Sequence, residues 1–382
     1  MSDDRLPGPP AKPTVIGKIG PWLLIIPSAI VGVLLVELFC RLFLPSLAST
    51  PEIDQWPRLA MFFDGPETIF RNHEEIFTFI PQSEFRNLTA IFPGESFAVE
   101  YDYRFRTNNF GLVQDTDIVP ERDSLLLLGD SFTEGQGAEP WFRLISPEID
   151  KRGYQSINGG LRGTGFQQWL KLDRYLTARN VRIRKVVVLF ISDDFHRPLT
   201  NIKPSELQCL AALSACHLDE SYYFRLPPRD ELSSWIVKIK AAQAPVERSW
   251  LGARAAVLLP ESYHVYRYFK EQIKKSASDP RLEGAERQSR TAIAELIRLY
   301  GPDNVTFIHL PQKDEIDGPN ELGLRARRSI RQAGGKLFDG FKLCRLTATD
   351  YYMNDNHPNR DGYAKIASCV TNVIKEVTAG AP

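Results

Sequence analysis

The stretch Ser124-Leu-Leu-Leu-Leu-Gly-Asp-Ser-Phe-Thr-Glu-Gly135 decides the fold of this 382-residue chain. The run of leucines that ends at Gly129 is typical of a strand buried on both faces in a parallel sheet. Asp130 and Ser131 follow the strand at once, and the sequence then continues towards a helix. Such a strand places its last polar side chains at the carboxyl edge of the sheet, where ligands bind in open α/β folds.

On both sides of this stretch, apolar runs alternate with segments of helical periodicity. Strands are predicted over residues 124–128, 154–158, 185–191, 305–310 and 336–338, and helices over 138–151, 166–180, 284–300, 319–333 and 361–377. This alternation predicts an α/β fold with three α/β/α layers around a central parallel sheet, formed by residues 121–382. The Pro-rich segment 197–280 interrupts the alternation, and we expect an insertion that caps the carboxyl edge.

The first 120 residues have a different character. Residues 1–18 form a polar tail, and residues 19–44 are apolar apart from Glu37 and Arg41. Because a membrane span needs about 20 mostly apolar residues, we expect a single transmembrane anchor over 19–44. The basic residues before it favour a cytoplasmic N-terminus and a periplasmic or extracellular body. A signal peptide cleaved near residue 48 is the alternative. Residues 45–120 predict an extension with β structure, in which 97–106 alternates like a strand with one buried face.

Composition excludes some function classes. Lys plus Arg and Asp plus Glu both number 47, so no net charge attracts nucleic acid, and no nucleic-acid motif is present. Beyond the anchor, four cysteines allow two disulfides, in three possible pairings. A local pair between Cys209 and Cys216 is plausible, and four free thiols are the alternative. The cysteine and histidine spacing predicts no metal site.

Ser131 is the central candidate for chemistry, because a hydroxyl at the end of a buried strand is exposed beside free backbone N–H groups. Serine needs a base within hydrogen-bond reach. His357 and Asp355 supply a base and a carboxylate, in a loop rich in Pro, Asn and Gly before the last helix. The alternative is that Ser131 caps a helix and that Asp355 caps a turn.

Four short blocks together resemble the SGNH hydrolase (GDSL) superfamily: Gly129-Asp-Ser131, Asn158-Gly-Gly160, Asp193-Asp194 and Asp355-x-His357. The segment Arg106-Thr-Asn-Asn-Phe-Gly111 resembles the lead-in of membrane-anchored bacterial members. The resemblance implies a flavodoxin-like fold and a serine hydrolase that uses no metal or organic cofactor. It also implies an oxyanion hole made by the backbone N–H groups of Ser131 and Gly160 and by the side chain at position 193.

Two positions depart from the family pattern. The family has Asn where this chain has Asp193, and an ionised carboxylate repels an oxyanion. Asp193 must therefore be protonated, turned away, or replaced in its role by another donor. The acid that usually stands three residues before the histidine is Asn354 here. We expect Asp355 to take its role, with Asn354 as a neutral orienting residue.

The leading hypothesis is an exported esterase or deacylase, and the predicted anchor and exported location point to an acyl ester of a glycan or a lipid as its substrate. Two alternatives stay open. The same serine could transfer the acyl group to a polysaccharide hydroxyl, as an O-acyltransferase. Asp193 also motivates a non-catalytic SGNH domain that binds glycans or protein partners, and the sequence identifies no protein partner.

Overall fold

The computed structural model describes residues 16–43, 58–92, 97–138, 141–243, 262 and 280–379, which belong to two compact units. The first unit contains helix α1 (Ile16–Phe43). Within the described residues, no helix has the length and apolar character that crossing a membrane requires. The structure therefore does not confirm the span predicted over residues 19–44, and the tail predicted over 1–18 lies largely outside the described residues.

The second unit is built on a five-stranded parallel sheet with the order β11-β10-β8-β6-β7. Its strands are β6 (Ser124–Gly129), β7 (Gln155–Gly160), β8 (Ile183–Phe190), β10 (Val305–His309) and β11 (Lys336–Asp339). Numbered along the chain, this order is 2-1-3-4-5, the flavodoxin-like arrangement. All six residues of β6 are buried, as the leucine run predicts for a central strand. The predicted α/β fold with a parallel sheet is confirmed.

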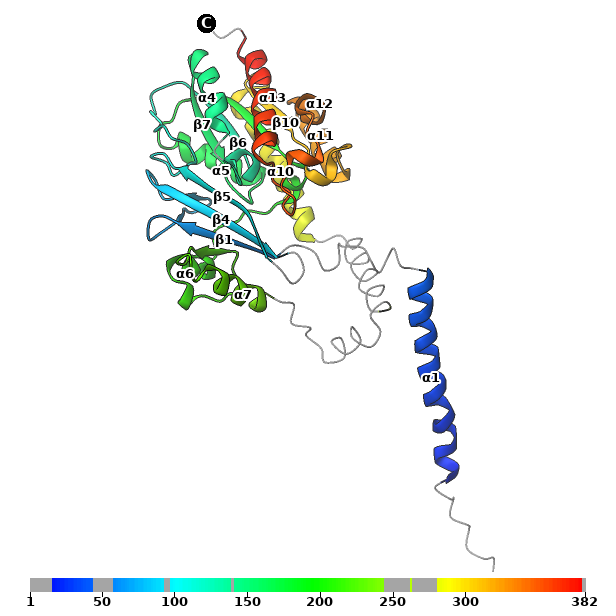
Figure 1. Cartoon of the computed structure of the whole chain (residues 1–382). Coiled ribbons are helices and arrows are strands. Elements are labelled where there is room, and N and C mark those ends of the chain that lie inside the picture. Colours follow the sequence, from blue (N-terminus) through cyan, green and yellow to red (C-terminus); the bar gives the residue numbers. More distant parts are fainter. Residues whose placement is uncertain are drawn as a thin grey trace, which may run out of the picture. The chain divides into compact units, whose positions relative to one another are not determined.

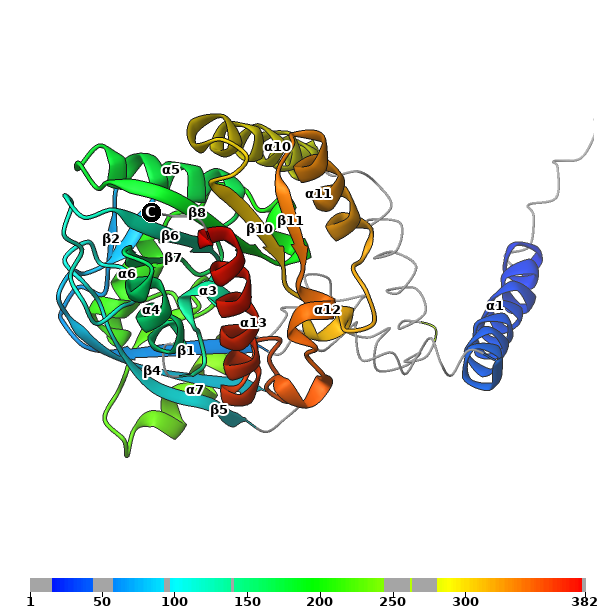
Figure 2. The same ribbon diagram turned by 90° about the horizontal axis from the view of Figure 1, so that it is seen from above.

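Helices cover both faces of this sheet (Figure 2). One face packs against α5 (Phe166–Thr177), α10 (Pro280–Tyr300) and α11 (Glu321–Gln332). The other face packs against α4 (Phe142–Lys151), α12 (Gly340–Cys344) and α13 (Arg360–Thr378). Neighbouring residues of β6 contribute to opposite cores, since Leu126 and Leu128 belong to the first and Leu125 and Leu127 to the second. The second unit therefore has the three layers that the alternation predicts.

The N-terminal extension forms a second sheet with the order β5-β4-β1-β9. Its strands are β1 (Arg58–Asp64), β4 (Glu84–Phe92), β5 (Ala98–Arg106) and β9 (Tyr223–Arg225), beside a hairpin of β2 (Phe70–Asn72) and β3 (Phe77–Phe79). The strand predicted over 97–106 is β5, with Tyr101, Tyr103 and Phe105 buried on one face. Strand β9 comes from the segment 197–280 and pairs in parallel with β1.

The described part of 197–280 packs on this second sheet. Helices α6 (Pro204–Ala211) and α7 (Leu232–Ala242) cover the face that carries Ala60 and Phe62, and the sheet lies between these helices and the α/β layers (Figure 1). The expectation that this insertion itself caps the carboxyl edge is therefore corrected for its described part. The other face of the second sheet makes the contacts with the carboxyl-edge loops described below.

Cysteine pairing is also resolved in the second unit. Cys344 in α12 and Cys369 in α13 form a disulfide, whereas Cys209 and Cys216 are free thiols. Of the alternatives that the sequence leaves open, neither a local Cys209–Cys216 pair nor four free thiols is found. Cys209 packs in the core between α6 and the second sheet, and the Cys216 thiol donates to the Leu213 carbonyl at 3.3 Å.

Candidate active site

Ser131 lies where the leucine strand predicts, as the first residue of the short helix α3 (Ser131–Glu134) directly after β6. Asp130 caps this helix, because its carboxylate accepts from the Phe132 N–H at 2.9 Å. Gly135 ends it in the left-handed region at φ +92°, which favours glycine. The turn therefore holds Ser131 at the carboxyl edge of the sheet. Its side chain is largely covered, with the residue 6% exposed.

His357 and Asp355 complete a continuous chain of contacts with Ser131. The Ser131 Oγ lies 2.8 Å from His357 Nε2, although the two residues are 226 positions apart. Both Asp355 carboxylate oxygens lie 2.9 Å from His357 Nδ1. When Asp355 accepts from the Nδ1–H, Nε2 keeps the lone pair that accepts the serine hydroxyl. The structure thus brings together the three side chains that the sequence selects.

The charges around His357 suit a base that becomes protonated. Burial disfavours the imidazolium, but the charge and hydrogen bond of Asp355 outweigh burial and raise the pKa of His357 above its ordinary value of 6.5. Burial likewise disfavours the Asp355 carboxylate, and the His357 charge and hydrogen bond outweigh it, so the pKa of Asp355 is lowered. Each partner therefore stabilises the charged form of the other.

Strand β5 supplies two contacts that the sequence did not reveal. The Tyr101 hydroxyl accepts from Gln136 Nε2 at 2.7 Å, and this side chain helps to lower the pKa of the Asp355 carboxyl. The neighbouring Glu100 carboxylate accepts from the backbone and side-chain amides of Asn354, each at 2.8 Å. Asn354 is thus held by Glu100, and among the described residues only Asp355 bonds to the His357 ring at Nδ1. The idea that Asn354 orients the histidine is not supported.

The oxyanion-hole residues predicted by the resemblance behave differently from one another. No described residue accepts from the Ser131 N–H, which opens the first turn of α3. The Gly160 N–H, in contrast, donates to Asn158 Oδ1 at 3.0 Å. The prediction that Gly160 offers a free N–H is therefore not supported. Gly160 also lies so close to the Glu134 backbone that a side chain there would clash.

Asp193 lies in the short 3₁₀ segment Ser192–His196 that follows β8. Its carboxylate accepts from Gln312 Nε2 at 3.2 Å, and the residue is half-buried. Its partner is therefore an amide from the segment after β10, which satisfies the carboxylate without the serine. The next residue, Asp194, is fully buried and bonds to Arg197, which also reaches Asp130 at 2.8 Å. Burial and the nearby Asp130 raise the pKa of Asp194 well above its ordinary range.

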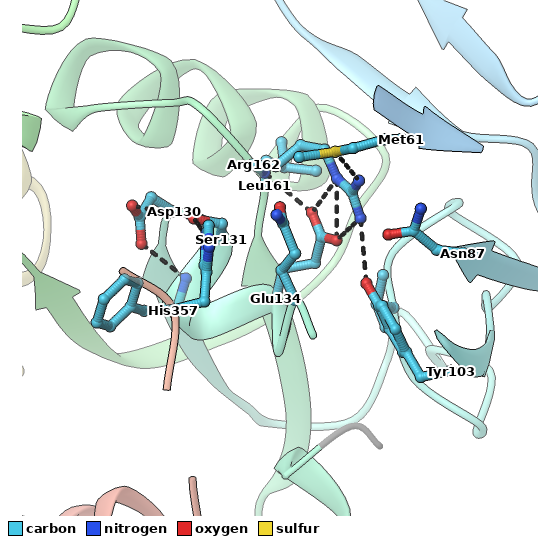
Figure 3. A network of polar contacts seen from close by, with 12 residues as sticks. Met61, Asn87, Tyr103, Asp130, Ser131, Glu134, Leu161, Arg162 and His357 are labelled. Atoms are coloured by element: carbon cyan, nitrogen blue, oxygen red, sulfur yellow. Dashed lines mark hydrogen bonds and ion pairs between the residues drawn. The ribbon is translucent and has the colours of Figure 1, made fainter. Parts of the chain in front are cut away.

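A buried ion pair joins the serine helix to the second sheet (Figure 3). Arg162, in the loop after β7, pairs with Glu134 of α3, and both side chains are 2% exposed. The Arg162 backbone N–H also donates to Glu134 Oε2 at 3.0 Å. The guanidinium lies 3.4 Å from the Tyr103 hydroxyl and stacks near the rings of Phe63 and Phe79. Removing either charge would leave the other buried and unpaired, a change that typically costs about 3–5 kcal/mol.

The side chains that commonly bind metal ions are His, Cys, Asp and Glu. Across the described parts of the chain, no group of three or more His, Cys, Asp or Glu side chains is arranged to hold a metal ion. The arrangement that these residues do form, a hydroxyl joined to an imidazole and then to a carboxylate, can activate the hydroxyl as a nucleophile.

No family model matches the chain, and no curated protein matches it. Among solved structures, it is similar to a protein from Lactobacillus plantarum at 12% identity and a TM-score of 0.34, covering 67% of this chain and 97% of that one. An acetyl xylan esterase variant from Geobacillus stearothermophilus gives 12% identity, a TM-score of 0.32 and coverage of 68% and 96%. A putative GDSL-like lipase from Bacteroides ovatus gives 11% identity, a TM-score of 0.31 and coverage of 84% and 74%.

Such low identities and TM-scores carry no argument about function, which rests on the side-chain geometry. Another solved structure to which the chain is similar is a putative lipolytic protein of the G-D-S-L family from Desulfitobacterium hafniense, at 11% identity and a TM-score of 0.26.

Proposed function

We propose that this protein is a serine esterase that hydrolyses acyl esters. The observation that carries the proposal is the unbroken contact from Ser131 Oγ to His357 Nε2 at 2.8 Å and from His357 Nδ1 to Asp355 at 2.9 Å. A serine and a histidine at this distance are within reach for proton transfer. The carboxylate fixes the tautomer in which the transfer can run.

In the acylation step, Ser131 Oγ attacks the ester carbonyl carbon while His357 Nε2 takes the hydroxyl proton. The negative charge that develops on the carbonyl oxygen faces the Ser131 N–H, the donor left free at the start of α3. The imidazolium, stabilised by Asp355, then gives its proton to the departing alcohol. An acyl-enzyme on Ser131 remains.

In the deacylation step, water takes the place of the alcohol. His357 removes a proton from the water, whose oxygen attacks the acyl carbon, and the imidazolium returns the proton to Ser131 Oγ. The products are a carboxylic acid and the free enzyme. Asp193 has no part in these steps, since its carboxylate is satisfied by Gln312.

The cellular setting is a further part of the proposal. The Cys344–Cys369 disulfide supports work in an oxidising compartment outside the cytoplasm. The apolar sequence of residues 19–44 supports a single N-terminal membrane anchor, and α1 carries large exposed apolar side chains from Ile30 to Leu42. An acyl ester of a glycan is the substrate class we favour at such a location.

Labelling with a fluorophosphonate probe tests the nucleophile. We expect stoichiometric labelling of the wild-type chain and none of Ser131→Ala, with hydrolysis of p-nitrophenyl acetate lost in Ser131→Ala and His357→Ala. Because neutral His357 is the active form, kcat/KM should fall on the acid side with an apparent pKa above 6.5. A wild-type chain that takes no label would refute the esterase and favour a binding domain.

A further inference from the structure

A cleft of about 740 Å³ lies beside the loop that carries Asp355 and His357, here called the catalytic loop. The proposed reaction assigns no role to this cleft. One wall is made by residues of strands β4 and β5. The other wall contains Gly137 and Ala138 after α3, Arg143 of α4, Tyr352, and Arg360 at the start of α13. Its size is in the range of small-molecule and oligosaccharide sites.

The lining is strongly basic. The lining contains two carboxylates, Glu84 and Asp102, and five arginines that come from both walls: Arg86, Arg104, Arg106, Arg143 and Arg360. A concave surface lined with one sign of charge concentrates its field in the cleft and attracts ligands of the opposite sign. The whole chain has no net charge, so this excess of cations is a local feature.

The two carboxylates are already neutralised within the sheet. Asp102 pairs with Arg86, and Glu84 lies 3.7 Å from Arg104. In the described part of the chain, no carboxylate forms an ion pair with Arg106 or Arg360. These two guanidinium groups, one on each wall, are therefore the cations with capacity for an external anion.

The paired arginines of this cleft indicate which kind of anion an arginine there can bind. Arg86 donates from Nε and Nη2 to the two oxygens of Asp102, at 2.8 and 2.6 Å. Arg143 binds Asp115 in the same two-pronged way. A guanidinium in this geometry matches a planar carboxylate better than a single point charge does. A ligand carboxylate can bind Arg106 or Arg360 in the same manner.

The cleft shares a wall with the catalytic loop. Tyr352 donates its hydroxyl to the Gly137 carbonyl, and its backbone N–H donates to the His357 carbonyl at 3.1 Å. Arg360 follows His357 by three positions in the chain. A molecule lying along Tyr352 and Arg360 is thus next to the loop that carries the proposed base.

We propose that this cleft binds the carboxylated sugar units of an anionic polysaccharide whose acyl ester is presented to Ser131. The proposal rests on the proposed esterase function for the role of the ligand, which is the alcohol part of the ester. Arg106 and Arg360 bind uronate carboxylates from opposite walls, and the Tyr352 ring offers an apolar surface to a sugar face. Arg106 and Arg360 are then specificity residues that act at a distance from the reacting carbonyl.

Calorimetric titration of the full chain carrying Ser131→Ala with hexagalacturonate tests the cleft without requiring turnover. We expect binding that weakens as ionic strength rises, and no binding of neutral maltohexaose. Adding Arg106→Gln and Arg360→Gln together should weaken hexagalacturonate binding at least about tenfold, because each removes a charge-assisted contact. The matched control is Arg122→Gln, an exposed arginine before β6 outside the cleft, which should bind like its parent.

Three results would overturn the proposal: equal binding of the charged and neutral hexasaccharides, no loss in the double variant, or an equal loss in Arg122→Gln. Vesicles containing anionic phospholipid form a further arm. If they bind through Arg106 and Arg360 while hexagalacturonate does not, the cleft recognises a lipid surface and the saccharide proposal fails. Failure of the proposed esterase would appear separately, as absent fluorophosphonate labelling with oligosaccharide binding retained.

Discussion

At the scale of single residues, Tyr101 acts on the reacting groups through another side chain. It lies on β5 and helps to lower the pKa of the Asp355 carboxyl, which in turn bonds to His357. Both Tyr101 and Asp355 are shielded from solvent, so the polar hydroxyl stabilises this anion in a low-dielectric setting. Tyr101 is therefore a positioning residue for the proposed acid.

Replacing Tyr101 with Phe removes the hydroxyl and keeps the ring. We expect kcat on p-nitrophenyl acetate to fall about tenfold, with KM little changed, because the Asp355 carboxylate that stabilises the imidazolium loses a polar neighbour. The acid limb of the pH profile should shift as well, a response that a purely structural tyrosine would not give. Tyr154→Phe, at a tyrosine that precedes β7, is the matched control. Equal loss in both variants would contradict a specific role for Tyr101.

The roles of some site residues could be predicted from local sequence patterns, whereas the hydrogen-bond partners of others depend on the folded structure. Ser131 and His357 were predictable because each follows a local pattern that places it at the carboxyl edge of the sheet. The state of the Gly160 N–H was not predictable, because it donates to the side-chain oxygen of Asn158, two residues earlier in the chain. The Asp193 partner was not predictable either, since Gln312 comes from a different strand end, 119 positions away.

At the scale of elements, Asp173 is a charge buried between two helices. It lies in α5, is 2% exposed, and accepts from the Tyr300 hydroxyl at the end of α10. Burial raises the pKa of Asp173 from 3.8 to about 6, while the Tyr300 hydrogen bond and Arg174 act in the opposite direction. Because the folded state holds the proton more tightly, this carboxyl contributes a loss of stability as pH rises from about 4 to about 6.

We expect Asp173→Asn to unfold at higher urea concentration than wild type at pH 7. The amide keeps an acceptor for Tyr300 and removes the cost of a buried charge, which is at most about 3 kcal/mol for a shift of this size. The difference between the two proteins should disappear near pH 4. Asp150→Asn, at an exposed position of α4, should stay within about 0.5 kcal/mol of wild type. If Asp173→Asn is the less stable protein at pH 7, the hydrogen bond outweighs the burial of charge.

A helix or strand can be predicted from sequence only when its own residues carry a recognisable pattern. Strands β6 and β8 each contain a continuous apolar run, Leu125–Leu128 and Val186–Phe190, which marks them as buried strands. Strand β9 has only three residues, Tyr223–Arg225, and exists because they pair with Met61–Phe63. No periodicity marks a strand that short, so the insertion was not predictable as part of the second sheet.

At the scale of the whole second unit, distant segments meet at one edge of the parallel sheet. Glu100 binds Asn354 across 254 positions, and Arg162 reaches Met61 across 101 positions. Local sequence patterns mark the proposed catalytic residues and the extension separately. They do not indicate that the extension contacts the loop of Asp355 and His357, because these contacts depend on tertiary packing and leave no local pattern.

The Cys344–Cys369 disulfide constrains this same edge. It joins α12 to α13, and the 25-residue interval that it closes contains Asp355 and His357. In the chain-entropy account, closing a loop of this length stabilises the fold by about 3 kcal/mol, mainly by restricting the unfolded chain. The bond therefore stabilises the segment that presents the proposed base to Ser131.

We expect the double variant Cys344→Ala, Cys369→Ala to melt about 6–12 °C below wild type, given about 3 kcal/mol for the bond and about 2–4 °C for each kcal/mol lost in domains of 150–250 residues. Wild type in a reducing buffer should show the same decrease, whereas the double variant should melt at one temperature with or without reductant. The free thiols of Cys209 and Cys216 provide the control, because Cys209→Ala, Cys216→Ala should keep the response to reductant. A wild-type protein that melts at the same temperature in both buffers would show that the bond does not stabilise the catalytic loop. Tertiary contacts such as Glu100 with Asn354 would then be enough to hold it.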